Sequence, residues 1–250
     1  MTRVTAGISP ATLVALWDPA GLEPPHRRLT ALLGAIEGAD AIGGDTLGGR
    51  NRRLLLFHRA LDGAPLEAHV KCAHCAVDNE FALPADAILA GPAPDPEARI
   101  RIRIDGRTLA FRLPRMHDIE RACDETGADP VGAVLERCLT SGGGPIPATA
   151  ALRLERKFES LDPAANIVVT ISCSGCAKPI AASVDPASFV ARELDRIVDL
   201  LLRDIDTIAS AYGWDEAAIL ALPLERRRRY VAMIAARRAP ARPSLAGARA

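Results

Sequence analysis

The chain has 250 residues, and its 31 lysine and arginine residues balance its 31 aspartate and glutamate residues, so the formal net charge is zero. Apolar residues make up 49% and charged residues 25% of the sequence, which is typical of a globular protein with a substantial core. This composition excludes a largely disordered chain, and no apolar run approaches the roughly 20 residues of a membrane-spanning helix. The first residues make a poor signal peptide, so we expect a cytoplasmic protein with reduced cysteines and no membrane partner.

Residues 1–65 are predicted to form an N-terminal helical region. Apolar residues recur at helical spacing before Pro24-Pro25 and again over Leu29–Ile36, and a third helix is expected over Leu54–Leu61. Gly43-Gly44 and Gly48-Gly49 bracket the sequence between the second and third helices. No Gly-Lys-Ser/Thr follows these glycines, so they are interpreted as a flexible loop between helices and not as a phosphate loop.

Two distant segments share one pattern, in which an alternating strand leads into a CxxC turn and a second alternating strand follows. The first segment runs from Leu66 to Leu83 and the second from Asn166 to Val184. The match indicates an internal duplication of a cysteine hairpin. Residues 66–185 are therefore predicted to be a zinc-ribbon-like module, with knuckles at 66–91 and 162–185.

The four cysteines of these hairpins are the only constellation in the sequence with clear chemical content. One CxxC knuckle supplies half of a tetrahedral shell, and structural zinc needs two such pairs, with Zn–S distances of about 2.3 Å. The predicted ligands of one structural zinc per chain are Cys72, Cys75, Cys173 and Cys176. Two alternatives stay open: a thioredoxin-like redox pair, and metal-free relics of a zinc hairpin.

Residues 97–160 are predicted to be an insertion between the knuckles. Isoleucines alternate with arginines from Ile100, Asp105-Gly106 supplies a two-residue turn, and the alternation returns through Leu113. Helices are expected over Arg115–Asp124, Val131–Leu139 and Pro147–Ser160, with a linker at Ser141–Gly144.

Residues 186–238 are predicted to be a C-terminal helical region. Asp185-Pro186 is a helix-start signal, and apolar residues then occupy one face as far as Tyr212. Two short helices follow, after Trp214 and after Pro223. Residues 239–250 are expected to be a disordered tail.

The predicted fold class is therefore α+β, mostly helical with small antiparallel hairpins. The five histidines are scattered, without a nucleophile motif or an HExxH pattern, so the sequence predicts a non-enzyme without a small-molecule substrate. Arg226–Arg229 and the arginines that follow make the last 25 residues basic. Three interpretations stay open: weak, non-specific nucleic-acid binding, the solvated face of a terminal helix, or contact with an acidic protein.

Several ordered motifs resemble the T-even-type phage base plate protein family, which occurs in contractile phage tails and related bacterial contractile injection systems. The resemblance covers about residues 10 to 236, and its most specific part is the Tyr-Gly-Trp motif with the arginines that follow. The motifs, in chain order, are Leu47-Gly-Gly-Arg-Asn-Arg-Arg-Leu-Leu-Leu56, the Cys72/Cys75 pair, Phe111-Arg-Leu-Pro114 with Asp118-Ile119, Leu135-Glu-Arg-Cys-Leu139, the Cys173/Cys176 pair, Asp185-Pro-Ala-Ser-Phe189, and Ala211-Tyr-Gly-Trp through Pro223 to Tyr230.

The resemblance implies a non-catalytic hub or assembly-chaperone role in building a base plate, with other base plate and tail proteins as partners. Knuckles of the family usually read Cys-Pro-x-Cys-Gly, whereas these read Cys-Ala-His-Cys-Ala and Cys-Ser-Gly-Cys-Ala. The alternative function is a zinc-ribbon nucleic-acid-binding protein that uses the arginine-rich C-terminus. The two short C-terminal helices carry many apolar side chains and are predicted to pack on the body of the chain or to dock on a partner.

Overall fold

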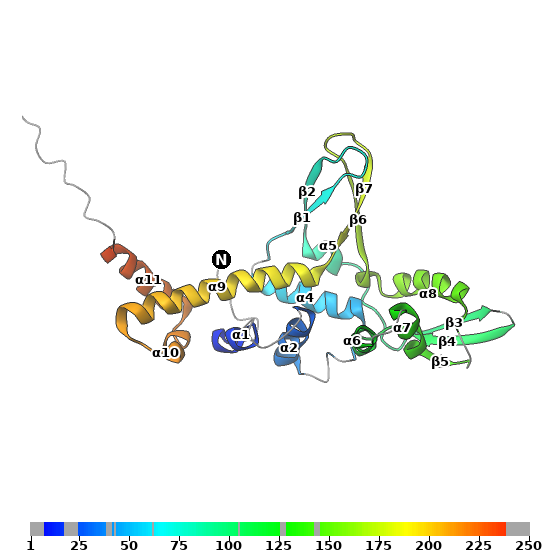
Figure 1. Ribbon diagram of the computed structural model, residues 1–250, viewed down its shortest axis with the longest axis horizontal. Coiled ribbons are helices and arrows are strands. Elements are labelled where there is room, and N and C mark those ends of the chain that lie inside the picture. The colour runs from blue at the N-terminus through cyan, green and yellow to red at the C-terminus, as the bar shows by residue number, and fades with distance from the viewer. Residues whose placement is uncertain are drawn as a thin grey trace, which may run out of the picture.

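A single long helix, α9 (Pro186–Tyr212), runs through the middle of the computed structural model (Figure 1). The structure describes residues 8–17, 25–38, 42, 44–61, 63–104, 106–125, 129–142 and 146–238. Within these ranges the chain is mostly helical with antiparallel sheets of two or three strands, which confirms the predicted α+β class. None of the helices in these ranges is both long and apolar enough to cross a membrane. The predicted disordered tail lies outside the described residues.

The start and end of α9 follow from its sequence. The Asp185 carboxylate accepts hydrogen bonds from the backbone N–H groups of Ala187 and Ser188 at 3.1 and 3.2 Å, as an N-cap does. Gly213 follows the last turn with φ of 66°, the left-handed conformation that commonly ends a helix.

The N-terminal helices pack along α9 in the main core of the molecule (Figure 1). These helices are α1 (Pro10–Trp17), α2 (Pro25–Glu37) and α4 (Leu47–Leu61). The indole N–H of Trp17 donates to the Asp195 carboxylate of α9 at 2.7 Å, which fixes α1 against that helix. Segments that lie at opposite ends of the sequence therefore share one hydrophobic core.

The helix α4 begins seven residues earlier than predicted, at Leu47, and the predicted loop at Gly48-Gly49 is wrong. The N–H of Gly48 donates to an Asp162 carboxylate oxygen at 2.9 Å, and that of Gly49 donates to Thr46 Oγ1 at 3.0 Å. A Cβ at Gly48 would lie 1.8 Å from the other Asp162 oxygen. The glycine thus permits close packing of the helix start, and Asp162 supplies the anion that satisfies it.

The inserted segment forms a separate small sheet with its own helices. The structure contains the predicted hairpin of β3 (Arg99–Ile104) and β4 (Arg107–Arg112). It also has a third strand, β5 (Leu139–Ser141), which pairs with β4 and includes part of the predicted linker. The helices α6 (Met116–Asp124), α7 (Pro130–Cys138) and α8 (Ala148–Leu161) accompany the sheet. Gly106 has the positive φ expected of the turn, and Asp105 lies outside the described residues. A second core joins the sheet to α7 and α8.

The two cysteine hairpins project together from the helical body (Figure 1). One consists of β1 (Leu66–Lys71) and β2 (Asp78–Leu83), and the other of β6 (Ile167–Ser172) and β7 (Pro179–Val184). Their registers coincide when 101 is added to each residue number, the difference between Cys72 and Cys173. The structure therefore confirms the predicted duplication. Two short helices flank the hairpins, α5 (Ala85–Leu89) after β2 and η1 (Pro163–Ala165) before β6.

The last two helices fold back against the end of α9 that is remote from the hairpins. They are α10 (Glu216–Leu220) and α11 (Leu224–Arg238). Ile219, Leu220 and Ile234 are buried there against Ile205 and Ile208 of α9. These three side chains of the last two helices therefore pack within the chain.

Candidate metal centre

The CxxC turns of the two hairpins have the same backbone hydrogen bonds. In the first turn the Cys72 N–H donates to the Val77 carbonyl and the Ala76 N–H to the Cys72 carbonyl, both at 2.9 Å. In the second turn Cys173 donates to the Lys178 carbonyl and accepts from Ala177, again at 2.9 Å. Each turn thus reverses the chain so that both of its cysteines face the other hairpin.

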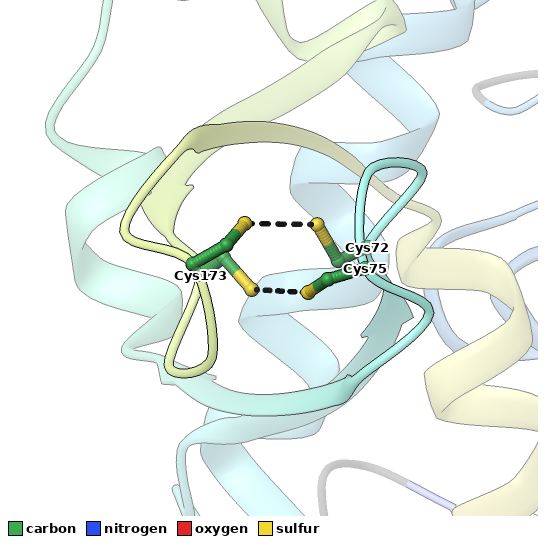
Figure 2. A group of neighbouring side chains, drawn as sticks. Cys72, Cys75 and Cys173 are labelled. Atoms are coloured by element: carbon green, nitrogen blue, oxygen red, sulfur yellow. Dashed lines mark hydrogen bonds between the residues drawn. The ribbon is translucent and has the colours of Figure 1, made fainter.

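The four cysteine sulfurs converge between the hairpins (Figure 2). The Sγ atoms of Cys72 and Cys176 lie 3.8 Å apart, and those of Cys75 and Cys173 lie 3.5 Å apart. All four sulfurs lie within 4.8 Å of one another, and none of these cysteines is in a disulfide. The structure therefore brings together every ligand predicted from the sequence, closely enough to hold one metal ion.

The surroundings favour the thiolate form at Cys173, whereas hydrogen bonds shared with the neighbouring cysteines raise the pKa of the Cys75 thiol to about 12 and also raise the pKa of Cys176. Backbone N–H groups point at the two buried cysteines: His74 donates to Cys72 Sγ and Gly175 to Cys173 Sγ, each at 3.4 Å. Hydrogen bonding from the backbone of Cys176 and of Gly175 lowers the pKa of the Cys173 thiol to about 6. Metal ligation needs deprotonated sulfur, so these N–H groups prepare the site for a cation.

Asn79 on β2 links the two turns, and the sequence analysis did not identify it. Its side chain is buried, and Oδ1 accepts from the backbone N–H and the hydroxyl of Ser174, at 2.8 and 3.0 Å. Its Nδ2 donates to the Val77 carbonyl at 2.9 Å and lies 3.8 Å from Cys173 Sγ. An asparagine in an alternating strand gives no signal by itself, because its partner is 95 residues away.

Ala76 and Ala177, which follow the second cysteine of each pair, have positive φ values of 59° and 57°. These are the positions at which the resembling family has glycine. An alanine adopts this left-handed conformation at a cost, which the hydrogen bonds of each turn offset. Both turns therefore have the same left-handed residue, although it is an alanine and not a glycine.

The two histidines near the cysteines stand apart from the cluster. His74 is exposed in the first turn, and exposed His69 lies on β1 with its Nδ1 3.6 Å from a carboxylate oxygen of Glu80. Neither belongs to the group of close metal-binding atoms found among the described residues. Neither CxxC begins a helix, so neither has the helix N-terminus that activates the thiol of a thioredoxin-like pair.

No protein-family model, curated protein or solved structure matches this chain. Its function is therefore argued from the residues and the geometry of the cysteine cluster.

Proposed function

We propose that the four cysteines hold one structural zinc ion, and their convergence in a single cluster carries this proposal. A tetrahedron with Zn–S bonds of about 2.3 Å has edges of about 3.8 Å. The cross-hairpin separations of 3.5 and 3.8 Å fit those edges. Four thiolates complete the shell and leave no open position for a substrate, which is the arrangement of a structural rather than a catalytic site.

The zinc content of the purified protein tests this proposal. Protein purified under reducing, chelator-free conditions is expected to carry about one zinc per chain by elemental analysis. Cys173→Ser should lose the metal, whereas Cys123→Ser, which changes an exposed cysteine outside the cluster, should keep it. Metal-free wild-type protein, or equal metal content in both variants, would rule out the zinc site.

We further propose that the protein is a non-catalytic structural or assembly protein of a base plate, in a contractile phage tail or injection system. The support is the ordered set of resembling motifs, several of which have clear structural roles in this fold. Gly48 fits the start of α4 against Asp162, and the Asp185 motif caps α9. Other base plate and tail proteins are the partners in this proposal, and assembly takes place in the cytoplasm.

Deletion of the gene in the producing strain tests this role. Electron microscopy is expected to show no complete sheathed particles, and particles should return when the wild-type gene is supplied. Genes for sheath, tube and spike proteins are expected beside this one. Normal particles in the deletion strain would refute the assembly role.

The exposed arginines of α11 support the alternative function, a zinc-ribbon nucleic-acid-binding protein. Arg226, Arg229, Arg237 and Arg238 are all exposed on this helix. Phosphate neutralisation would make such binding fall steeply with salt. Under the base plate proposal, we expect the purified protein to bind DNA only weakly and non-specifically, and salt should abolish this binding. A sequence-selective complex with DNA at physiological salt would instead favour the nucleic-acid-binding function.

A further inference from the structure

The two sides of α11 differ sharply in their surroundings. Ile234 is buried against α9, and Arg227, which is only 1% exposed, donates from Nε to Asp204 Oδ2 at 3.1 Å. Residues spaced by three or four form an exposed stripe next to this buried side, which we name the α11 basic face. It consists of Arg226, Arg229, Met233 and Arg237.

The charges of the α11 basic face are not neutralised by the described part of the chain. Arg228 pairs with Glu225 at 3.3 Å, but no ion pair joins Arg226, Arg229 or Arg237 to any described acidic residue. The uncompensated face is therefore complementary to an acidic partner.

An apolar group lies at the centre of this face. Met233 lies between Arg229 and Arg237 on this face, and its side chain is 44% exposed. Tyr230, three residues before Met233, packs its ring against those of Tyr212 and Trp214, with centroids 5.1 to 5.6 Å apart. Trp214 is 36% exposed. The side chains around Met233 line a depression of about 850 Å³. An apolar centre within a charged rim is the usual composition of a protein–protein interface.

We propose that the α11 basic face binds an acidic amphipathic helix of another protein. This inference rests on the proposed assembly function and names the chemistry of the partner. The face runs from Arg226 to Arg237, about 16 Å at 1.5 Å per residue, so it matches about three turns of a partner helix. Apolar side chains of that helix contact Met233, and carboxylates on either side pair with the arginines.

A protein partner fits this surface better than nucleic acid. Phosphate contacts use charged and polar groups and leave no role for an exposed methionine at the centre. The helix on which α11 packs exposes acids as well as arginines, such as Asp199, Arg203 and Asp206, so the uniformly basic surface ends with α11. A short helix that stays on the α11 basic face matches this extent better than an extended phosphate backbone.

A photo-crosslinker at the centre of the face identifies what binds there. Met233→p-benzoylphenylalanine in the full chain, produced in the native strain, is expected to crosslink to a peptide of another protein with acidic residues at helical spacing. The same residue at Leu152, which is 67% exposed on α8, is the control and should not capture this peptide. Crosslinking to nucleic acid alone, or no intermolecular product, would overturn the inference.

Charge reversal then tests the arginines. Arg226→Glu with Arg237→Glu should reduce the crosslink at position 233 by at least about tenfold, because like charges would face the acidic helix. Arg101→Glu with Arg103→Glu, two exposed arginines of β3, is the matched control and should leave the yield unchanged. An equal yield in both double variants would contradict the proposed chemistry.

The results distinguish this inference from the base plate proposal. An acidic helix captured from a protein that takes no part in base plate or tail assembly would refute the base plate role and leave the surface assignment standing. If the deletion strain makes no particles but the crosslinker at position 233 captures no protein, the surface assignment alone is refuted.

Discussion

At the scale of single residues, the cysteine turns depend on a few backbone and side-chain details. Ala76 and Ala177 hold the left-handed conformation, and Asn79 bridges the turns by hydrogen bonds to Ser174. Each of these residues lies next to a metal ligand in space, so small changes there should alter the stability or the metal affinity of the whole cluster.

Glycine at either left-handed position should stabilise the zinc-loaded protein. Ala76→Gly or Ala177→Gly is expected to raise the free energy of unfolding by up to about 1 kcal/mol, because glycine adopts positive φ without steric cost. Chemical denaturation measures the change. Ala181→Gly in the exposed middle of β7 is the control and should destabilise, because that residue has ordinary strand geometry. If all three variants destabilise equally, the turns are not strained.

Removal of the Asn79 side chain should weaken metal binding. Asn79→Ala is expected to lower zinc affinity by about 10- to 100-fold, the usual effect of losing a group that orients a metal ligand. A competition titration with a chromogenic chelator measures the affinity. Asp78→Ala changes the exposed neighbour on the same strand and should have little effect. Equal affinities in the two variants would show that Asn79 does not support the site.

At the scale of elements, two buried polar contacts fix the inserted segment: one ties the end of its last helix to α4, and the other ties its sheet to α6. Asp162, at the end of α8, accepts from Gly48 at the start of α4. Arg112 of β4 donates to both carboxylate oxygens of Asp118 in α6, at 2.6 and 2.9 Å. Both contacts explain residues that the sequence analysis had only noted as parts of a resembling motif.

Substitution of Gly48 should destabilise the fold more than the same change one residue later. Gly48→Ala is expected to cost about 1–3 kcal/mol through overpacking, since its Cβ would also lie 2.7 Å from the Ala165 nitrogen. Gly49→Ala has its nearest neighbour at 3.2 Å, and it should remain within about 1 kcal/mol of the wild type. Thermal unfolding compares the two. Similar midpoints would contradict the close packing at Gly48.

The Arg112–Asp118 pair should make stability depend on acid pH. Burial acts to raise the pKa of Asp118, but hydrogen bonds from Arg112 and the Arg115 backbone outweigh it, so the pKa lies below the ordinary 3.8. The pair therefore stabilises the fold above pH 3.8, and this contribution is lost as the pH falls through the lowered pKa.

The variant Asp118→Asn should unfold more easily at neutral pH by about 3 kcal/mol, and its stability should change less below pH 4. Urea unfolding at pH 7 and at pH 3 measures both effects. Asp124→Asn removes an exposed partner of Arg27 and should cost less than about 1 kcal/mol. A pH profile of Asp118→Asn that parallels the wild type would contradict this role.

At the scale of the whole molecule, separate cores serve the helical body, the inserted sheet and the cysteine hairpins. At the tip of the hairpins the buried cluster contains only Cys72, Cys173 and Ile180. Two-stranded hairpins are marginally stable in water, so the proposed zinc would supply much of the order there.

Zinc removal should therefore loosen the hairpins and spare the helical body. Hydrogen exchange with and without chelator, under reducing conditions, is expected to show lost protection in β1, β2, β6 and β7. Amides of α9 should keep their protection, because Leu194 and Val198 pack in a core that contains no cysteine. Equal loss of protection in α9 would show that the metal holds the whole chain together.

Local signals were sufficient for much of this fold. The helix α9 begins at Asp185-Pro186 and ends at Tyr212 as predicted, and alternation with a CxxC turn predicted both cysteine hairpins. These elements are decided within a few residues by capping, turn conformation and the period of apolar side chains. The ligand set Cys72, Cys75, Cys173 and Cys176 followed from the same local pattern because it occurs twice.

Tertiary structure alone decided what those elements contact. Gly48 lies in a helix because Asp162 is there to cap it, and Asn79 supports the cluster because Ser174 comes from the other hairpin. The apolar side of α11 was open to two readings, and contact with Ile205 and Ile208 fixed it as part of the fold. Such contacts join residues far apart in the chain, and their free energy exists only once the intervening segments have folded.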